Sequence, residues 1–592
     1  MYSVRRAPLV LGRASAQRLY STTPPPPRTR TRRPIRTILF LTSAISGGAL
    51  LGLYSDARSC PTPPFKLAEI TPRPEHNISP PLSTLLRTYL VYGLTTCETI
   101  VDHAPVILDT LLKVPFIGTV VESVVRRTFF AHFVGGETAR AAYPLLSALR
   151  NQNKGALFAY SVEVDEHEAS GEHHIDKGPN SGKTSKQPVH KRIVEEMIRS
   201  IDVAADFEDE VGTRQVAGRR TWVAIKLTAL LPNADALRNL SLHLTRTRHA
   251  LSPPVPYPGT PEPSDLSILH GRIPERSPLT SQDVEDLKEL YHDLNRICAR
   301  AKDRSVRIIL DAEHSWYQPA IDAFGHALME RFNKLSDRRG RTSIFASGLR
   351  SAQAEELQPI VYVTYQAYLR RTPNHLTRSL ALARQNNYAL GVKLVRGAYH
   401  THELAAYSAA ASSGSIAISP DPYPPVHSSK VDTDACYNEC ATLLVRTIAD
   451  DVKSSAGRPP RIGVLFGTHN WMSSELILGE LVKNGLAHED TASTDGIHKG
   501  TVMVPSEVAE RLTFGQLYGM SDSLTNYLVG RIKSTTPCVI KYVPYGALVE
   551  VMPYISRRAI ENKSVLGNGG AVRERKEAAR LIWKRVFGGV GL

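Results

Sequence analysis

The chain has 592 residues, of which 42% are hydrophobic and 22% are charged, a balance typical of a globular protein and unlike that of a disordered one. The formal net charge is +15, but nine arginines lie within residues 1–55 and no acidic residue occurs before Asp56. The basic character is thus concentrated at one end, so the charge does not indicate a protein that binds nucleic acid.

The N-terminal segment has the composition of a targeting sequence. Residues 1–37 are rich in arginine and proline and lack acidic residues, which predicts a mitochondrial transit peptide followed by a linker, with a disordered basic tail as the alternative. Residues 38–56 contain an apolar run that ends at Tyr54 and is barely long enough to cross a bilayer. We expect either a membrane anchor or a hydrophobic extension of the targeting segment there.

The six cysteines do not indicate a disulfide framework or a zinc site. No pair has the C-x-x-C spacing, and Cys436 and Cys440 lie one helical turn apart. Reduced structural thiols in an intracellular compartment are the expectation, which is compatible with the mitochondrial matrix.

Two parts of the chain differ from a compact core. Residues 57–155 begin proline-rich and become helical in pattern, which predicts an N-terminal helical region. Residues 164–190 are polar and predict an exposed insertion, whereas the proline-rich residues 252–263 predict an extended linker.

From residue 156 to residue 570 a repeating pattern predicts an α/β protein. Short β-branched runs alternate with helical stretches, which indicates a parallel sheet, and eight such units favour a (β/α)8 TIM-like barrel. The seventh run is the weakest of the eight. The expected strands are residues 156–162, 222–227, 306–310, 360–363, 390–395, 462–466, 513–517 and 538–543.

Charged residues alternate with apolar ones inside these strands. In the run Val306-Arg-Ile-Ile-Leu-Asp311 the apolar set Val306, Ile308 and Leu310 would face the helices, which leaves Arg307 and Asp311 toward the barrel axis. Lys226 and Lys393 take inward positions by the same reasoning. Because an inward charge needs a partner or a ligand, either a buried ion network or a binding site is expected.

Polar residues also follow nearly every strand, where active sites of this fold class lie. The ends are marked by Glu163, Lys226, Asp311, Thr364, Gln366, Arg396, Thr468, Asn470, Gln516 and Tyr542. The sequence has no phosphate-binding P-loop, no G-x-S-x-G nucleophile elbow and no H-E-x-x-H zinc motif.

The charges at these ends favour an anionic cofactor and an anionic substrate over a metal. Asp311, Glu313, His314 and His469 have side chains that can ligate a metal, but several cations face them. Gln366, Asn470 and Lys393 suit the rim of a flavin ring, and Arg396, Lys430 and Thr468 suit its phosphates and ribityl chain.

A predicted helix after residue 546 carries two adjacent arginines. Its residues Tyr554, Arg557, Arg558 and Glu561 are three and four apart and share one broad face. An arginine fork matches a planar carboxylate, so this face is either a carboxylate clamp or a solvated, salt-bridged surface.

Taken together, these motifs resemble the proline dehydrogenase family. The resemblance spans about residues 126–567 and is similar to the stand-alone eukaryotic mitochondrial form, since no aldehyde dehydrogenase half or DNA-binding domain is present. It rests on Lys226-Leu-Thr-Ala-Leu230, Asp311-Ala-Glu313, Thr364-Tyr-Gln-Ala-Tyr368, Lys393-Leu-Val-Arg-Gly-Ala-Tyr399, Thr468-His-Asn470, Gln516-Leu-Tyr-Gly-Met520 and Tyr554-x-x-Arg-Arg-x-x-Glu-Asn562.

The resemblance implies an FAD-containing barrel that oxidises L-proline to Δ1-pyrroline-5-carboxylate and passes electrons to a membrane quinone on the matrix side of the mitochondrial inner membrane. It implies a substrate site formed by Lys226, Asp311, Tyr542, Tyr554, Arg557, Arg558 and Glu561, in which the two arginines clamp the carboxylate. It implies that FAD is held by Gln366, Lys393, Arg396, Gly397, Ala398, Tyr399, Lys430, Thr433, Thr468, His469 and Asn470.

Three other functions stay open at this point. A 4-hydroxyproline dehydrogenase is the close relative, although the bulk of Tyr542 disfavours an added hydroxyl. A Schiff-base enzyme would use Lys226 or Lys393 as nucleophile, and an inactive membrane-tethered scaffold would bind neither flavin nor proline. The basic amphipathic tail, residues 571–592, is expected either to lie on a membrane surface or to dock on the barrel.

Overall fold

The computed structural model of the protein describes residues 52–59, 80–96, 116–161, 187–213, 218–335, 357–409, 416–454, 459–490, 500–563 and 570–588, with four single residues between 100 and 115. The chain divides into units 1–55 and 56–592, and the elements below belong to the second. The candidate targeting segment and nearly all of the candidate anchor lie outside the described residues. Among the helices that are described, none combines the length and hydropathy needed to cross a bilayer.

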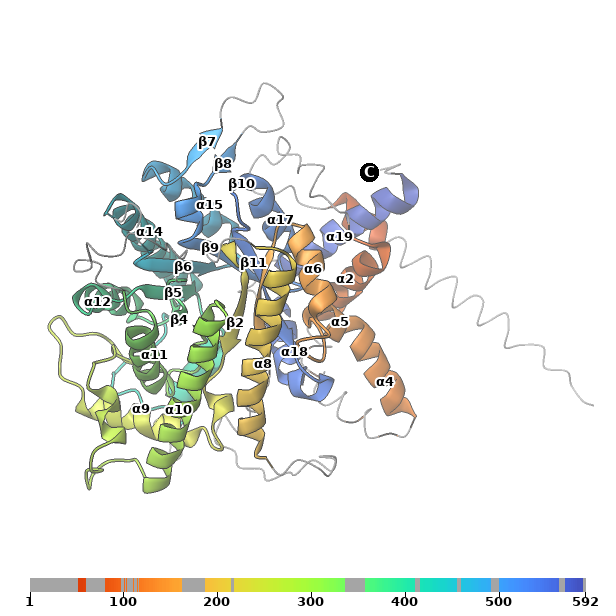
Figure 1. The fold of residues 1–592 in the computed structure, drawn as a ribbon. Helices are drawn as coiled ribbons and strands as arrows, with labels where there is room; N and C mark the ends of the chain where they lie inside the picture. The colour runs from red at the N-terminus through yellow and green to blue at the C-terminus, as the bar shows by residue number, and fades with distance from the viewer. Residues whose placement is uncertain are drawn as a thin grey trace, which may run out of the picture. The chain divides into compact units, whose positions relative to one another are not determined.

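Eight parallel strands close into a barrel, which confirms the predicted fold class (Figure 1). Their order around the barrel is β1-β11-β9-β6-β5-β4-β3-β2. Each of the eight predicted runs is one of these strands, with ends that differ by a few residues. The strands are β1 (Gly155–Tyr160), β2 (Thr221–Ile225), β3 (Ile308–Leu310), β4 (Val361–Gln366), β5 (Leu390–Val395), β6 (Ile462–Gly467), β9 (Leu512–Leu517) and β11 (Val539–Tyr545).

Helices surround the strands and connect one to the next (Figure 1). Local sequence sets several of their starts: Thr280 and Asp283 form a capping box at the first turn of α10, and proline occupies the first turn of α11 and α12. The helices are α8 (Val189–Glu210), α9 (Asp235–Thr247), α10 (Ser281–Asp303), α11 (Gln318–Phe332), α12 (Thr372–Gln385), α13 (His400–Ala409), α14 (Lys430–Ser454), α15 (Trp471–Lys483), α16 (Ser506–Ala509) and α17 (Asp522–Arg531), with short 3-10 turns η4 (Thr228–Leu230) and η5 (Asp265–Leu269).

A small sheet that the sequence did not predict lies beside the barrel. It has the order β10-β8-β7 and comprises β7 (His488–Asp490), β8 (Thr501–Met503) and β10 (Ile532–Lys533). Its strands are only two or three residues long, too short for a periodic pattern to reveal them.

The predicted alternation within the strands is confirmed by two separate hydrophobic clusters. Val306, Ile308 and Leu310 belong to the large cluster between strands and helices. Ile309 belongs to a smaller cluster on the barrel axis, together with Leu157, Ala159, Trp222, Ala224, Tyr362, Leu465 and Ile540. The inner cluster fills the barrel, so a ligand can enter only beyond the ends of the strands.

Helices from both ends of the chain pack together beside the barrel. The N-terminal ones are α2 (Leu82–Thr95), α4 (Ile117–Val125), the π-helical turn η2 (Arg126–Phe130), α5 (Ala131–Phe133) and α6 (Tyr143–Asn151). The C-terminal ones are α18 (Leu548–Lys563) and α19 (Gly570–Phe587). Helix α19 packs along α2, where Arg575 hydrogen-bonds Asp56 and Thr96 (both 3.1 Å), so the tail docks on the body of the protein.

The proline-rich residues 252–263 are not the extended linker that their composition predicts. Tyr257 is buried and its hydroxyl donates to the carbonyl of Ser315 (2.6 Å), while Arg371 donates to the carbonyl of Gly259 (2.6 Å). One buried aromatic ring is enough to anchor the segment to the barrel. Residues 162–186, which contain most of the other insertion, lie outside the described residues.

Candidate active site

A cavity of about 900 Å³ lies at the carboxyl ends of the barrel strands. Its walls come from the strand ends, from the starts of α14 and α15, and from α18 and α19. All eighteen residues named from the sequence line this one cavity: Lys226, Asp311, Gln366, Lys393, Arg396, Gly397, Ala398, Tyr399, Lys430, Thr433, Thr468, His469, Asn470, Tyr542, Tyr554, Arg557, Arg558 and Glu561. The volume is at the upper end of the range for ligand sites, enough for a large cofactor.

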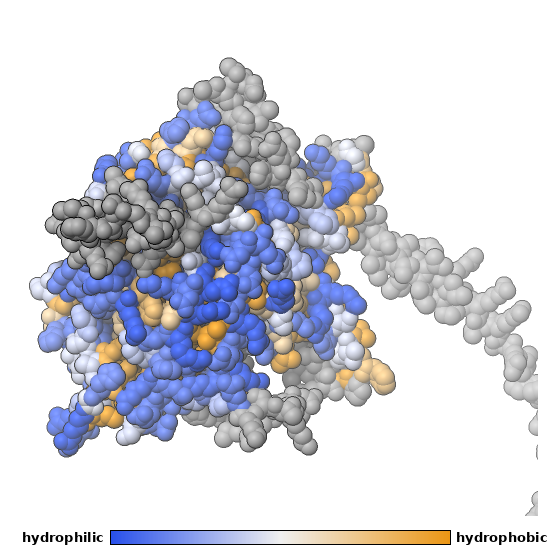
Figure 2. Space-filling view, viewed as in Figure 1, coloured by the Kyte–Doolittle hydropathy of each residue, from blue (hydrophilic) through white to orange (hydrophobic). Residues whose placement is uncertain are grey.

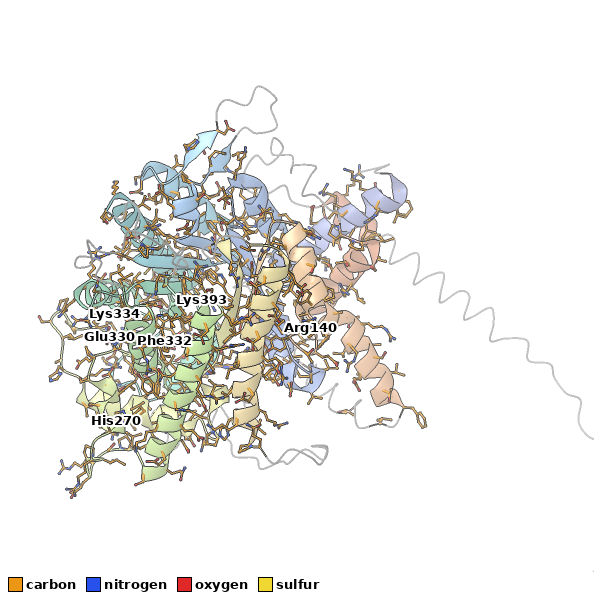
Figure 3. All side chains as sticks on the ribbon, in the orientation of Figure 1. Arg140, His270, Glu330, Phe332, Lys334 and Lys393 are labelled. Carbon is orange, nitrogen blue, oxygen red and sulfur yellow. The ribbon has the colours of Figure 1, made fainter. Side chains whose placement is uncertain are left out.

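At the floor of the cavity a lysine, a carboxylate and a tyrosine form one group. The ammonium of Lys393 contacts Asp311 Oδ1 at 2.5 Å, and the hydroxyl of Tyr542 donates to Asp311 Oδ2 at 2.9 Å. The ammonium also lies 5.2 Å from the centre of the Tyr542 ring. Lys393 is seen among the strands in Figure 3. Three strands, β5, β3 and β11, thus fix one charged group from three sides.

Helix α18 supplies the opposite wall. Pro553 lies inside its first half, and the face predicted from the sequence turns toward the cavity. Arg558 is buried and pairs with Glu561 at 2.6 Å, and its guanidinium lies 5.0 Å from the centre of the Tyr554 ring. Arg557 lies 5.4 Å from the centre of the Tyr399 ring. Both planar forks are therefore held by aromatic rings, which leaves their edges suited to a planar anion.

A second cationic group lines another part of the cavity. Arg396 donates to Asp434 (2.6 Å), Thr468 (2.8 Å) and Ser473 (2.8 Å), and Lys430 pairs with the other oxygen of Asp434 at 2.5 Å. Burial would raise the pKa of Asp434, but hydrogen bonds from Lys430 and Arg396 outweigh it and hold the pKa below its usual value. Two cations on one carboxylate leave a net positive charge, which suits phosphate oxygens.

The cavity also has features that fit a flat ring with polar edges. The amide nitrogen of Gln366 donates to the carbonyl of Glu313 (3.1 Å), while its buried oxygen accepts no hydrogen bond among the described residues. Such an orphan acceptor needs an N–H donor. Gly397 has φ +125°, and a Cβ there would lie 2.5 Å from the Tyr368 ring, so the chain approaches this wall too closely for any side chain.

His469 is open to the cavity but stands among cations. Desolvation, and then the charges of Lys541, Arg558 and Arg396, lower its pKa to about 3. Its Nδ1 lies 2.8 Å from the hydroxyl of Ser521. The imidazole is therefore neutral at physiological pH and can either accept or donate a hydrogen bond to a ligand.

A buried carboxyl group lies behind the wall formed by Tyr399. Glu403 accepts from the backbone N–H of Ser315 (2.7 Å) and from its hydroxyl (2.6 Å), and burial raises its pKa to about 7. The Tyr399 ring is 4.1 Å from the imidazole of His314. Sequence reasoning did not single out Glu403, because nothing about its position on α13 marks it as buried.

Other lining residues were also missed. Asp434 follows Lys430 by one helical turn, a spacing that could have revealed it as a partner. Tyr92, Arg573 and Glu574 line the cavity from α2 and α19, and no local pattern indicates that these distant helices reach the barrel.

The structure gives no grouping that suggests a metal ion. Among the described residues, no three His, Cys, Asp or Glu side chains lie close enough to hold one. Glu313, one of the residues considered as a ligand, instead accepts hydrogen bonds from the backbone and hydroxyl of Thr228 (3.2 and 2.5 Å). Cys298, Cys436, Cys440 and Cys538 are free and buried.

Comparison with known proteins identifies the family. The family model described as proline dehydrogenase matches residues 180–569, about two thirds of the chain. The chain belongs to the proline dehydrogenase family. The matched segment contains seven of the eight barrel strands and every one of the eighteen cavity residues named above.

Relatives of this proline dehydrogenase family member come from several eukaryotes. "Proline dehydrogenase 2, mitochondrial" of Arabidopsis thaliana is 28% identical and is aligned over 85% of this chain and 88% of its own length. "Proline dehydrogenase 1, mitochondrial" of Drosophila melanogaster is 26% identical over 81% of this chain and 76% of its own. "Hydroxyproline dehydrogenase" of Rattus norvegicus is also 26% identical, over 79% of this chain and 83% of its own length. A solved structure of proline utilization A from Bdellovibrio bacteriovorus is 17% identical with a TM-score of 0.49, and this chain covers 37% of that longer protein.

Proposed function

We propose that this protein oxidises L-proline to Δ1-pyrroline-5-carboxylate with a bound FAD and passes the electrons to a membrane quinone. The observation that carries the proposal is the cavity itself, which sets two aromatic-supported arginines of α18 opposite the group formed by Lys393, Asp311 and Tyr542. Membership of the proline dehydrogenase family supports the same reaction.

The proposed substrate site lies between α18 and the barrel floor. Arg557 and Arg558 would bind the carboxylate of proline, with Tyr554 and Glu561 holding the Arg558 guanidinium and the Tyr399 ring supporting that of Arg557. Tyr542 would contact the pyrrolidine ring from the other side, and Lys226 would add positive charge at the end of β2. Binding the carboxylate at a fixed distance from the ring orients the carbon that loses the hydride.

The residues present fit FAD. Gln366, Lys393 and Asn470 would hold the edges of the isoalloxazine ring, and the buried acceptor of Gln366 meets the need of a ring N–H. Arg396, Lys430, Thr433, Thr468 and His469 would contact the phosphates and ribityl chain, with Gly397, Ala398 and Tyr399 forming the adjacent wall. When bound, the flavin would supply the hydride acceptor, and the positive charge of Lys393 would favour its negatively charged reduced form.

The decisive experiment is an absorption spectrum of the purified full chain. We expect flavin bands that bleach when L-proline is added without oxygen and return when a soluble quinone analogue is supplied. A folded protein without flavin bands, or with bands that proline does not bleach, would contradict the proposal.

A 4-hydroxyproline substrate is the second candidate, because relatives in Rattus norvegicus and Mus musculus are named hydroxyproline dehydrogenase. The Tyr542 ring is fixed by its hydroxyl bond to Asp311 and by Lys393, so it has little freedom to make room for an added hydroxyl group. We therefore expect a higher kcat/KM for proline than for trans-4-hydroxyproline, and the reverse order would favour the second candidate.

A Schiff-base reaction receives less support from the geometry. The Lys393 ammonium is engaged in an ion pair with Asp311, and an ammonium has no lone pair with which to attack a carbonyl. Borohydride trapping with a carbonyl substrate would label a lysine if this alternative were correct. An inactive scaffold would fail both the spectral and the trapping tests.

We place the protein at the matrix side of the mitochondrial inner membrane. The support is the arginine-rich, acid-free composition of residues 1–37 and the word mitochondrial in the names of the Arabidopsis and Drosophila relatives. Fractionation of mitochondria after import of the full chain would test this location, with protease protection of the barrel as the expected result.

A further inference from the structure

Helix α2 has apolar side chains on two opposite faces. One face packs inside the protein through Leu85, Val91 and Tyr92. The other exposes Leu82, Leu86 and Leu90, which are four residues apart, and the last two are 49% and 48% exposed. Only one of the fourteen residues of α2, Arg87, is charged. A helix that is apolar on both sides normally has both sides covered.

The end of α19 extends this exposed stripe. Arg585 donates to the carbonyl of Pro80 at 2.6 Å, which sets the last turn of α19 beside the first turn of α2. Val586 and Phe587 are exposed there, and the Trp583 ring lies 4.3 Å from the ring of Phe587. The exposed leucines of α2 and the aromatic end of α19 therefore belong to one surface.

Helix α4 exposes apolar residues on the same side of the barrel. None of its nine residues, all of which the structure describes, is buried, and Phe116 at its start is 90% exposed. The turn η2 continues α4 and packs against α2. In Figure 2 hydrophobic side chains gather at the right-hand edge, over the end of α19 and over α4. We call this surface the apolar helical face, formed by Leu82, Leu86, Leu90, Phe116, Ile117, Val120, Val124, Val586 and Phe587.

The charges around the apolar helical face are mostly positive. Helices α2 and α19 together contain seven basic residues and two acidic ones. Of the acidic ones, Glu574 is buried and Glu577 pairs with Arg580 at 2.6 Å, whereas Lys584 and Arg585 are exposed next to Val586 and Phe587. Apolar and aromatic side chains beside exposed cations are the pattern of elements that lie in the interface of an anionic bilayer.

We propose that the apolar helical face docks on an anionic phospholipid surface. A second protein copy would need a matching acidic partner for Lys584 and Arg585, whereas lipid headgroups supply negative charge and the acyl region takes up the exposed leucines and phenylalanines. The same helices form a wall of the cavity, since Tyr92 of α2 and Arg573 and Glu574 of α19 line it. Docking thus brings the cavity wall against the lipid, on the side from which an apolar electron acceptor dissolved in the bilayer would arrive. The point about the acceptor rests on the proposed function, but lipid docking does not.

The test is flotation of the full chain with vesicles of phosphatidylcholine that contain about one third phosphatidylglycerol. The variant Leu86→Glu/Leu90→Glu places two charges on the face without touching the core, and we expect it to bind at least about tenfold more weakly than the unchanged protein. Val189→Glu, at a 59% exposed valine on α8, is the matched control and should bind normally. Equal binding of both variants would overturn the proposal.

Trp583 provides a local readout that does not depend on any other lipid contact. Vesicles with brominated acyl chains should quench part of the tryptophan fluorescence of the unchanged protein, and Trp583→Phe should abolish that part. Quenching that persists in Trp583→Phe, or is absent in both, would contradict docking through α19. If the glutamate variant instead abolished a dimer seen by sedimentation and left flotation unchanged, the face would be a contact between copies. Proline oxidation with a soluble dye should be the same in all these variants, so failure of the proposed function is recognised separately.

Discussion

Strand β3 has a buried charge at each end, Arg307 just before it and Asp311 just after it, and both point toward the barrel axis. At the amino end the guanidinium of Arg307 donates to the backbone carbonyl of Arg219 (3.2 Å) and lies 5.1 Å from the Trp222 ring. At the carboxyl end the carboxylate of Asp311 contacts the side chains of Lys393 and Tyr542. The two ends differ in what their charges are bound to.

At the amino end the two buried arginines, Arg307 and Arg220, are held mainly by backbone groups. Arg220 donates to the carbonyls of Pro537 (2.8 Å), Ala509 (2.6 Å) and Arg219 (3.2 Å), and the fully buried Glu208 accepts from the Arg220 backbone (3.0 Å). Backbone carbonyls are fixed by the fold and cannot be released to a ligand. Charges held this way close the barrel and stabilise it.

At the carboxyl end the partners are side chains around a cavity of about 900 Å³. Lys393, Asp311, Arg557 and Arg558 can exchange partners when a ligand enters, because side chains rotate. Both ends carry buried charge, so burial alone does not identify a functional residue. A functional residue is identified by the kind of partner that its charge has and by a cavity next to it.

The largest expected effect is on substrate binding at the carboxyl end. Arg557→Met should remove one fork from the proposed carboxylate site and cost about 2–5 kcal/mol of affinity, because the substrate carboxylate loses one of its two charged partners. KM for proline should rise at least about thirtyfold, while the flavin spectrum and the melting temperature stay the same. Steady-state kinetics and the spectrum measure both. A variant with normal KM would remove Arg557 from the substrate site.

The matching change at the amino end should affect stability instead. Burial, and then the nearby charge of Arg307, lower the pKa of Arg220 to about 10, so its removal relieves some repulsion. It also takes their guanidinium donor from the carbonyls of Pro537 and Ala509, and we expect Arg220→Met to lower the free energy of unfolding by about 2–4 kcal/mol. Urea denaturation measures this loss, and KM for proline in the folded fraction should be unchanged. A raised KM would mean that the two ends are coupled.

The sequence was sufficient to predict the barrel and the set of cavity residues. Regular strands with an inward and an outward side give period-two patterns, and active sites of barrels lie at the strand ends, so Lys226, Asp311 and Lys393 could be selected without a structure. The arginines of α18 were found by their helical spacing. Every one of these signals is local or repeats along the chain.

The remaining parts depend on long-range packing. The contribution of α2 and α19 to the cavity arises from contacts between segments more than 400 residues apart, such as Tyr92 with the carbonyl of Gly519 (2.8 Å). The composition of the proline-rich segment 252–263 predicts an extended linker, yet the hydrogen bond of the Tyr257 hydroxyl anchors the segment to the barrel. The burial of Glu403 and Arg220 likewise depends on the segments that pack over them, and no periodic pattern in the sequence indicates this packing.

A pH-dependent effect should appear at Glu403. Burial raises its folded pKa from 4.5 to about 7, so between these values the unfolded chain has lost the proton and the folded protein keeps it. The contribution of Glu403 to the free energy of unfolding therefore falls as pH rises from about 4.5 to about 7, by up to about 3 kcal/mol. The glutamine in Glu403→Gln cannot ionise. As pH rises across this window, the free energy of unfolding of the variant should therefore increase relative to that of the unchanged protein. Urea denaturation at several pH values measures the difference, and a difference that stays constant with pH would contradict the raised pKa.

The smallest effect compares one hydroxyl at each end of the barrel. Tyr542→Phe keeps the ring but removes the donor to Asp311, whose ion pair with Lys393 remains and whose oxygen stays open to water in the cavity. We expect a loss of about 1 kcal/mol, seen as a five- to tenfold lower kcat/KM for proline, with the preference over 4-hydroxyproline retained because the ring still fills the space. Thr221→Val is the counterpart at the amino end, where the Thr221 hydroxyl donates to Glu208 of α8 at 2.6 Å, between the strand and the helix. It should lower the free energy of unfolding by a similar amount and leave kcat/KM unchanged. If both variants lost stability and neither lost activity, the group formed by Lys393, Asp311 and Tyr542 would have a structural role, like the buried charges at the amino end.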